Sequence, residues 1–395
     1  MRAAAVALVS LAVAACSVET APGPRPAGPA RGLAPLFAAL DAARGPVRIV
    51  QLGDSHSASD FLSGRLRELF QQRFGGAGRG LLPPGIPYPY FRPALVAVSE
   101  SEGWRHAGSL SASGPFGLTG SIAQSAEPGA SMTLDETEPG GFDRGFVEVL
   151  RQPGAGVLRW QVDDGAVHEL DTAAPRVAPQ WLDLAAPRGS RQLRLAAADG
   201  RAVTLLGWGS ERAGPGVVYE NLGISGATVG ILGHWSEAAV REELRHREPA
   251  AIVVAYGTNE AVEPVSALAD YGARFERAVG RLAAAAPNAA ILVVGPPDVN
   301  RRGTGECGGW TVPPGLALVR EAQRRAAARH GWYFWDWQQA MGGDCASDRW
   351  AAQDPPLAAP DHVHLTAAGY RRSAEMLFAV LMEAYRRYQA TRLAS

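Results

Sequence analysis

One short stretch of the chain brings a strand, a tight turn and a helix together: Val47-Arg48-Ile49-Val50-Gln51-Leu52-Gly53-Asp54-Ser55-His56. Residues 47–52 are mostly apolar, as in a strand buried within a sheet. Residues 58–74 carry apolar side chains at helical spacing, namely Phe61, Leu62, Leu66, Leu69 and Phe70. The stretch therefore predicts a strand that leads through Gly53 and Ser55 into a helix.

Strands and helices alternate again only after about residue 216. We expect strands at 216–219, 251–256, 290–294 and 332–337, and helices at 236–247, 265–285, 315–330 and 367–391. This alternation is typical of a parallel sheet that helices cover on both faces. The sequence therefore predicts an α/β fold.

Residues 96–215 follow a different pattern, with short alternating stretches separated by Gly, Pro and Asp. Examples are 146–150, 157–162, 181–184, 192–196 and 203–207. Such spacing is typical of a β-sandwich. A crossover between neighbouring parallel strands needs only about 30 residues. We therefore expect an inserted β-sandwich domain at 96–215 that divides one α/β domain into parts at 33–95 and 216–395.

The N-terminal residues indicate export. Arg2 precedes an apolar stretch at 3–15, which is too short to span a bilayer and is typical of a signal peptide. The stretch ends in Val13-Ala14-Ala15-Cys16, which resembles the lipobox of bacterial lipoproteins. We expect a lipoprotein signal peptide at 1–15, lipidation of Cys16 and a Pro-rich linker at 16–32. An ordinary secretory signal with a chance cysteine is the alternative.

Because Ser17 rather than Asp follows Cys16, the resemblance to Gram-negative lipoproteins implies a periplasmic location at the outer membrane. The formal net charge of −1 argues against nucleic acid as a partner. No residues show metal-ligand spacing, so we expect neither a metal nor another catalytic cofactor.

Cys307 and Cys345 are expected to form a disulfide, because the chain is expected to be exported. Two separate thiols remain the alternative, because pairing depends on the distance between the two residues.

The tripeptide Gly53-Asp54-Ser55 is weak evidence by itself, because Asp and Ser are also common helix caps. Three further motifs follow expected strands or precede an expected helix, namely Asn221-Leu222-Gly223-Ile224-Ser225-Gly226-Ala227-Thr228, Gly257-Thr258-Asn259-Glu260 and Asp361-His362-Val363-His364. Ligand sites of open α/β sheets gather at the carboxyl ends of the strands. We therefore expect the four motifs to meet at one site.

In this order the motifs resemble the conserved blocks of the SGNH, or GDSL, hydrolase superfamily. The resemblance implies a flavodoxin-like three-layer sheet and a serine esterase. In such an enzyme Ser55 would be the nucleophile, His364 the general base and Asp361 the carboxylate that orients the base. The resemblance also implies an oxyanion hole made by the backbone N–H groups of Ser55 and Gly226 and the side-chain amide of Asn259.

Three residues near these motifs need separate treatment. His362 is a rival base, but its spacing from Asp361 does not match the family motif, whereas that of His364 does. Glu260 stands where many family members have Asp. His56 is either a support for the site or a solvent-facing residue at a helix start, and we assign it no role.

The Gly53-Asp54-Ser55-His56 form, the Gly257–Glu260 variant and the inserted β-domain resemble the bacterial peptidoglycan O-acetylesterases, whose insert is similar to a carbohydrate-binding module. The resemblance implies an exported enzyme that removes O-acetyl groups from peptidoglycan through an acetyl-Ser55 intermediate. The alternatives are an SGNH esterase or lipase for another acetylated polysaccharide or acyl ester, and an inactive glycan-binding envelope lipoprotein. Trp160 and Trp181 either stack on sugars or belong to the core, which is the commoner fate.

Overall fold

The structure is a computed structural model that describes residues 30–393 of the chain. The expected signal peptide, Cys16 and the expected linker up to residue 29 lie outside the described residues. Within residues 30–393, every helix is too short or too polar to cross a bilayer.

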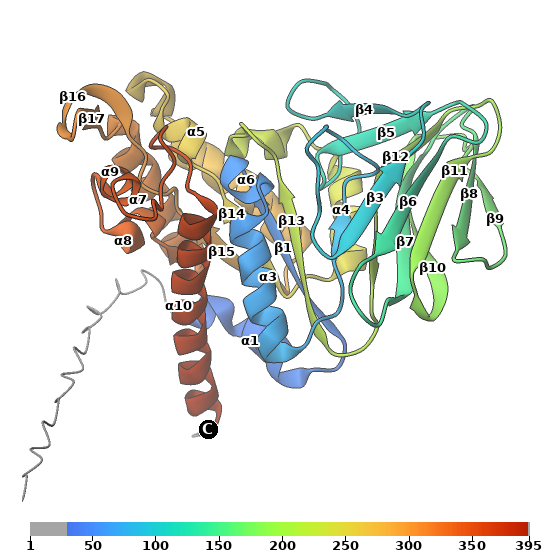
Figure 1. The fold of residues 1–395 in the computed structure, drawn as a ribbon, viewed down its shortest axis with the longest axis horizontal. Coiled ribbons are helices and arrows are strands. Elements are labelled where there is room, and N and C mark those ends of the chain that lie inside the picture. Colours follow the sequence, from blue (N-terminus) through green and yellow to red (C-terminus); the bar gives the residue numbers. More distant parts are fainter. Residues whose placement is uncertain (1–29, 394–395) are drawn as a thin grey trace, which may run out of the picture.

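Five parallel strands form the central sheet, in the spatial order β13, β1, β14, β15 and β18 (Figure 1). Their bounds are Pro46–Gly53 for β1, Gly216–Gly223 for β13, Ala251–Ala255 for β14, Ala290–Val294 for β15 and Tyr333–Trp335 for β18. Along β1, Ile49 packs into the core on one face of the sheet and Val50 into the core on the other. Both faces of the sheet are therefore buried, which explains its continuous apolar strands.

Helices cover the two faces in separate groups. On one face lie α1 (Ala34–Ala42), α3 (Phe61–Phe74) and α10 (Ala367–Leu393). On the other lie α4 (Glu237–Arg247), α6 (Tyr271–Ala285) and α7 (Pro314–His330). The expected three-layer α/β architecture is therefore confirmed.

The shorter elements lie mainly at the loops. They are η1 (Ala30–Leu33), α2 (Ser55–Ala58), η2 (Val229–Gly233), α5 (Thr258–Ala261), η3 (Val265–Leu268), α8 (Trp337–Met341), α9 (Ala346–Ala351), β16 (Arg301–Cys307) and β17 (Trp310–Thr311). A disulfide between Cys307 and Cys345 joins the β16–β17 hairpin to the residue before α9.

Two expected helices are each divided in the structure. The helix expected at 58–74 begins earlier, as α2, and is interrupted at Asp60, whose φ of +54° is left-handed. The Asp60 carboxylate accepts hydrogen bonds from Arg67, in α3, and from Asn221, which is 161 residues away, and these contacts hold the break. The helix expected at 265–285 is divided into η3 and α6.

Two antiparallel sheets form the inserted domain. One contains β10 (Ala178–Ser190), β7 (Phe142–Arg151), β12 (Val203–Glu211), β5 (Ser121–Ser125) and β4 (Arg105–Gly108) in that order, with β2 (Gly80–Leu82) also paired to β12. The other contains β3 (Val96–Glu100), β6 (Ser131–Glu136), β11 (Gln192–Ala197), β8 (Val157–Val162) and β9 (His168–Asp171). Apolar side chains from both sheets share one core, as in the β-sandwich that we expected. The pairing of β2 shows that residues before 96 also contribute to the sandwich.

Trp160 and Trp181, the two tryptophans weighed as platforms for sugars, pack against protein. Trp181 is only 7% exposed and lies between Phe146 and His246, with ring centroids 4.7 and 5.4 Å away. His246 belongs to α4, so Trp181 lies at the junction of the two domains. Trp160 stacks on His168, 5.2 Å away, and packs against the sandwich core. Trp181 is therefore a core residue rather than an exposed platform for sugars.

Buried charged groups also join the two domains. Arg48 in β1 and Arg247 in α4 both bind Glu211 of β12, at 2.5 and 2.8 Å. Glu243 of α4 accepts the backbone N–H of Leu118, at 2.5 Å. The carboxyl groups of Glu243 and Glu148, in β7, interact, and burial raises the pKa of both well above the ordinary value. The junction therefore favours the protonated form of this carboxyl pair.

This pair gives the stability of the protein a pH dependence with a definite sign. The folded protein retains a proton at Glu243 that the unfolded chain releases above about pH 4.5. The free energy of unfolding should therefore fall as the pH rises from about 4.5 through the raised folded-state pKa. Glu243→Gln keeps an acceptor for Leu118 but removes the titration. Its melting temperature relative to the wild type should rise by at least about 2 °C between about pH 5 and pH 9.

Glu237→Gln is the matched control, because Glu237 lies on the same helix with a side chain 76% exposed. Its melting temperature relative to the wild type should not change with pH. A constant offset for Glu243→Gln over the same range would contradict the role of the buried pair.

Candidate active site

Ser55 is the first residue of α2, directly after the carboxyl end of β1. The preceding Asp54 caps this helical turn, since its side chain accepts the backbone N–H of His56 at 3.0 Å. A Cβ at Gly53 would lie 2.3 Å from Ser57 Oγ and 2.7 Å from the carbonyl oxygen of Ala255. Only glycine fits this close approach. Because Asp54 is the cap, the Ser55 hydroxyl remains available for other contacts.

Ser55, His364 and Asp361 form a chain of hydrogen bonds. The distance from Ser55 Oγ to His364 Nε2 is 3.0 Å, and that from His364 Nδ1 to Asp361 Oδ2 is 2.7 Å. Burial tends to raise the pKa of Asp361, but hydrogen bonds from the His364 ring and from two backbone N–H groups outweigh it and lower this pKa. An ionised Asp361 accepts the proton on Nδ1, which leaves Nε2 to accept the serine proton.

The loop before α10 gives its two histidines different surroundings. The other oxygen of Asp361, Oδ1, accepts the backbone N–H groups of Val363 and His364, at 3.0 and 2.9 Å. Thr366 accepts the N–H of Gly369 at the start of α10, so Asp361 is not needed as a cap. His362 is buried and stacks on Trp310, with ring centroids 3.8 Å apart. Of the two, His364 is therefore the histidine hydrogen-bonded to Ser55.

The loops after β13 and β14 carry the two other expected oxyanion donors. Gly226 has a φ of +81°, and a Cβ there would lie 3.7 Å from the nearest atom, in Leu110. The left-handed backbone at this position therefore favours glycine. Crowding is not the reason, because there is room for a Cβ. Asn259 Nδ2 donates to the Ala227 carbonyl oxygen at 2.8 Å. This bond orients the amide and leaves its second N–H for another acceptor.

Glu260 connects the same two loops. It is 3% exposed, and its Oε1 accepts the backbone N–H of Val229 at 2.7 Å. Burial raises the pKa of this carboxyl to about 7. The glutamate thus fixes the loop of Asn259 against that of Gly226.

His56 supports the site from inside the protein. Its side chain is 1% exposed, and Nδ1 lies 2.9 Å from the hydroxyl of Tyr370 in α10. Burial lowers the pKa of His56 to about 3, so the ring is neutral. Its centroid lies 5.4 Å from that of His364. His56 belongs to the Gly53–His56 motif, but the motif alone gave it no role. Its buried contact with α10 shows that it supports the site.

Ser55 opens into a cavity of about 1090 Å³ between the α/β domain and the insert. Its walls include Arg79 and Tyr88 from the segment between α3 and β3, and Gly108 and Leu110 from the insert.

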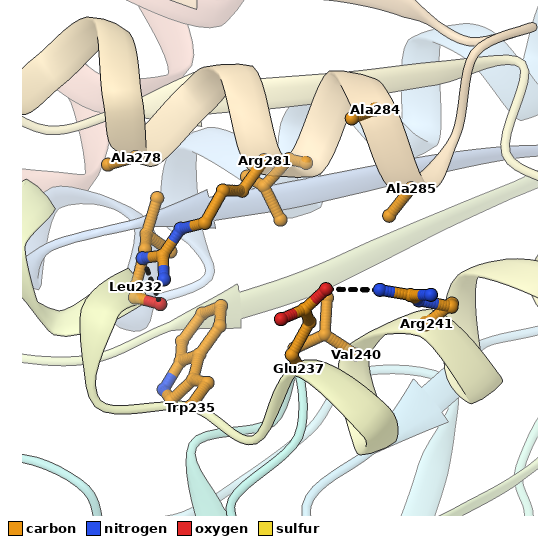
Figure 2. A pocket seen from close by; sticks show the side chains of 10 residues that line it. Leu232, Trp235, Glu237, Val240, Arg241, Ala278, Arg281, Ala284 and Ala285 are labelled. Carbon is orange, nitrogen blue, oxygen red and sulfur yellow. Dashed lines mark hydrogen bonds and ion pairs between the residues drawn. The ribbon is translucent and has the colours of Figure 1, made fainter.

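A second cavity, of about 320 Å³, lies between α4 and α6 (Figure 2). There Arg281 donates to the Leu232 carbonyl oxygen and Glu237 pairs with Arg241, so its charged groups already have partners. In residues 30–393, acidic, histidine and cysteine side chains form no cluster suited to a metal ion.

Residues 184–372 match the model of the GDSL-like lipase/acylhydrolase family. This span includes the motifs around Gly226, Asn259 and Asp361 and begins after Ser55. A solved structure of a peptidoglycan O-acetylesterase is similar at 29% identity and a TM-score of 0.78, with 92% of this chain and 99% of that one covered. The chain is an SGNH hydrolase.

Two further solved structures are less similar to this SGNH hydrolase. A family two carbohydrate esterase from Clostridium thermocellum shares 14% identity, covers 73% of this chain and 99% of its own, and has a TM-score of 0.33. A Bacillus subtilis protein, at 14% identity, covers 77% of this chain and 98% of its own, also with a TM-score of 0.33. No curated protein sequence matches. The family model and the peptidoglycan esterase together show that this SGNH hydrolase is a carboxylic ester hydrolase.

Asn259→Ala should lower kcat for an aryl acetate by about 100- to 1000-fold, because an oxyanion loses one donor. KM and the melting temperature should change little. Asn288→Ala is the control, since Asn288 is exposed on the loop between α6 and β15. A kcat for Asn259→Ala close to that of the control would show that the amide does not hold the oxyanion.

Proposed function

We propose that this SGNH hydrolase is an exported O-acetylesterase that removes acetyl groups from peptidoglycan glycan strands. The observation that carries the proposal is the hydrogen-bonded Ser55, His364 and Asp361 chain at a cavity shared with the insert. The similarity to a peptidoglycan O-acetylesterase over 92% of this chain, insert included, supports the choice of substrate.

In the first step, Ser55 Oγ attacks the carbonyl carbon of the acetyl ester while His364 Nε2 takes the serine proton. The negative charge on the carbonyl oxygen is held by the backbone N–H groups of Ser55 and Gly226 and by the Asn259 amide. When the carbonyl reforms, the bond to the sugar oxygen breaks and His364 gives its proton to that oxygen. The products are a free sugar hydroxyl and acetyl-Ser55.

In the second step, His364 takes a proton from a water molecule, whose oxygen attacks the acetyl carbon of acetyl-Ser55. The same donors hold the oxyanion again. Collapse breaks the bond to Ser55 Oγ, His364 returns the proton to the serine, and acetic acid leaves and ionises to acetate. Asp361 keeps its negative charge throughout and stabilises the imidazolium form of His364.

One observation favours a second candidate, an esterase for longer acyl chains. Phe61 and Leu110 both line the cavity, and their side chains are 49% and 53% exposed. Such apolar surface would suit an acyl chain as well as the face of a sugar. Comparing aryl acetate with aryl octanoate separates the candidates, since a strong preference for octanoate would contradict the acetylesterase proposal. The third alternative, an inactive glycan-binding protein, is not supported, because the chain is an ester hydrolase.

Ser55→Ala should lower acetate release from O-acetylated peptidoglycan by about 10⁴-fold or more, because the nucleophile is lost. Ser266→Ala, at an exposed serine of η3, should release acetate at the wild-type rate. Circular dichroism should show the same fold for all three proteins. Undiminished release by Ser55→Ala, or no release by the wild type, would contradict the proposal.

The site of action is the second part of the proposal. The apolar residues 3–15 and Cys16 support export with a lipid anchor, at the outer membrane, which would bring the enzyme to its substrate. Labelled palmitate should be incorporated into the wild type and not into Cys16→Ala. Equal incorporation by the two proteins would refute the anchor.

A further inference from the structure

Arg79 lies in the wall of the cavity that holds Ser55, yet it is only 2% exposed. Its Nε and Nη1 atoms have no hydrogen-bond partner. Among residues 30–393, no carboxylate lies within ion-pair distance of it. A buried guanidinium without a partner is unusual, because burying an unpaired charge costs free energy.

The neighbouring buried arginines are all paired. Arg67 binds both oxygens of Asp60, at 2.9 and 3.2 Å, and donates to the Tyr219 carbonyl oxygen. Arg48 and Arg247 share Glu211, and Arg247 also binds Glu220 at 2.5 Å. The unpartnered state of Arg79 is therefore a local property and not a general feature of this region.

The carboxylates nearest to Arg79 are already engaged. Asp60 accepts from Arg67, Ser63 and Asn221, and Glu220 accepts from Arg247 and the backbone of Leu81.

Four buried arginines (Arg48, Arg67, Arg79 and Arg247) thus face three carboxylates (Asp60, Glu211 and Glu220), and the partly exposed Arg144 also pairs with Glu211. The raised pKa of Glu148 and of Glu243 keeps that nearby pair from supplying the missing negative charge.

The charge of Arg79 persists despite its burial. Burial and the nearby Arg67 lower its pKa to about 10, against the opposing effect of Asp60 and Glu220. The side chain is therefore a cation at neutral pH. The cavity wall therefore contains one positive charge that has no negative partner in the protein.

The rest of the cavity has surface suited to a sugar ring. Tyr88, Tyr90 and Phe91 pack together, with ring centroids 5.0 and 5.4 Å from that of Tyr88, and Tyr90 is 77% exposed. Exposed aromatic rings offer an apolar face with a polar edge. The other charged groups of the wall have partners: His106 pairs with Glu100, and Arg92 donates to backbone carbonyl oxygens.

We propose that Arg79 binds a carboxylate of the substrate, so that the enzyme selects acetylated glycans that carry an acidic group close to the ester. This inference rests on the proposed O-acetylesterase function and specifies its substrate class. The side chain of Arg79 has the chemistry for such a role, because guanidinium and carboxylate form strong charge-assisted hydrogen bonds. A neutral acetylated glycan would leave the buried cation unpaired and should bind less well.

The test compares two forms of one glycan. O-acetylated peptidoglycan strands freed of peptide carry carboxylates, and coupling these groups to methylamine removes the charge while the acetyl esters remain. Acetylated oligogalacturonate, with and without the same coupling, is a second pair. Acetate release is measured for the wild type, Arg79→Gln, Arg79→Lys and Arg277→Gln, with aryl acetate as a substrate that has no carboxylate; Arg277 is exposed on α6 and does not line the cavity.

The wild type should prefer the acidic form of each pair. Arg79→Gln should lower kcat/KM for the acidic form by about 10- to 100-fold, mainly through KM, and should leave the coupled form and aryl acetate within a few fold of the wild type. Arg79→Lys should retain part of the preference because it keeps the charge. Arg277→Gln should retain all of it.

Two results would overturn the inference. One is the absence of any preference for the acidic forms in the wild type. This measurement needs no variant, so it does not depend on whether a variant folds. The other is an equal loss on acidic, coupled and aryl substrates in Arg79→Gln, which would assign Arg79 a purely structural role. If acetate is released from oligogalacturonate with the Arg79-dependent preference but not from peptidoglycan, the proposed function fails while the inference stands.

Discussion

The parallel pairing of β1 with both of its neighbours is the constraint on which the site depends. Gly53, at the end of β1, lies opposite Gly223 of β13 on one side and Ala255 of β14 on the other. Three loops therefore leave the sheet at the same level, and they carry Ser55, Gly226 and Asn259. A shift of one residue in either register would turn the strand's side chains to the other face and separate the serine from its donors.

The insert is part of this site and not an appended module. It begins to pair as early as β2, and buried ion pairs of Glu211 with Arg48 and Arg247 join it to the α/β domain. Its Gly108 and Leu110 form part of the cavity at Ser55. Docking of the insert therefore closes one side of the cavity and, with Arg79, sets the charge of its wall.

Local patterns in the chain were sufficient to predict most of the α/β framework. Continuous apolar runs predicted the buried strands, and helical spacing predicted the long helices, because both depend on which side chains face a core. The predictions were wrong where distant contacts decide the backbone. The break at Asp60 is held in part by Asn221, which is 161 residues away, and β2 pairs with the distant strand β12.

The sequence by itself determined the chemistry, because reactive residue types and their order in the chain need no coordinates: a serine at a strand end, an asparagine after a later strand and an Asp-x-x-His motif before the last helix. Only the tertiary structure decided the surroundings of these residues. It buried His56 against Tyr370, turned His362 toward Trp310 and left Arg79 without a partner. Burial and pairing arise from contacts between distant segments, and so nothing in the sequence marks Arg79 as an unpaired cation.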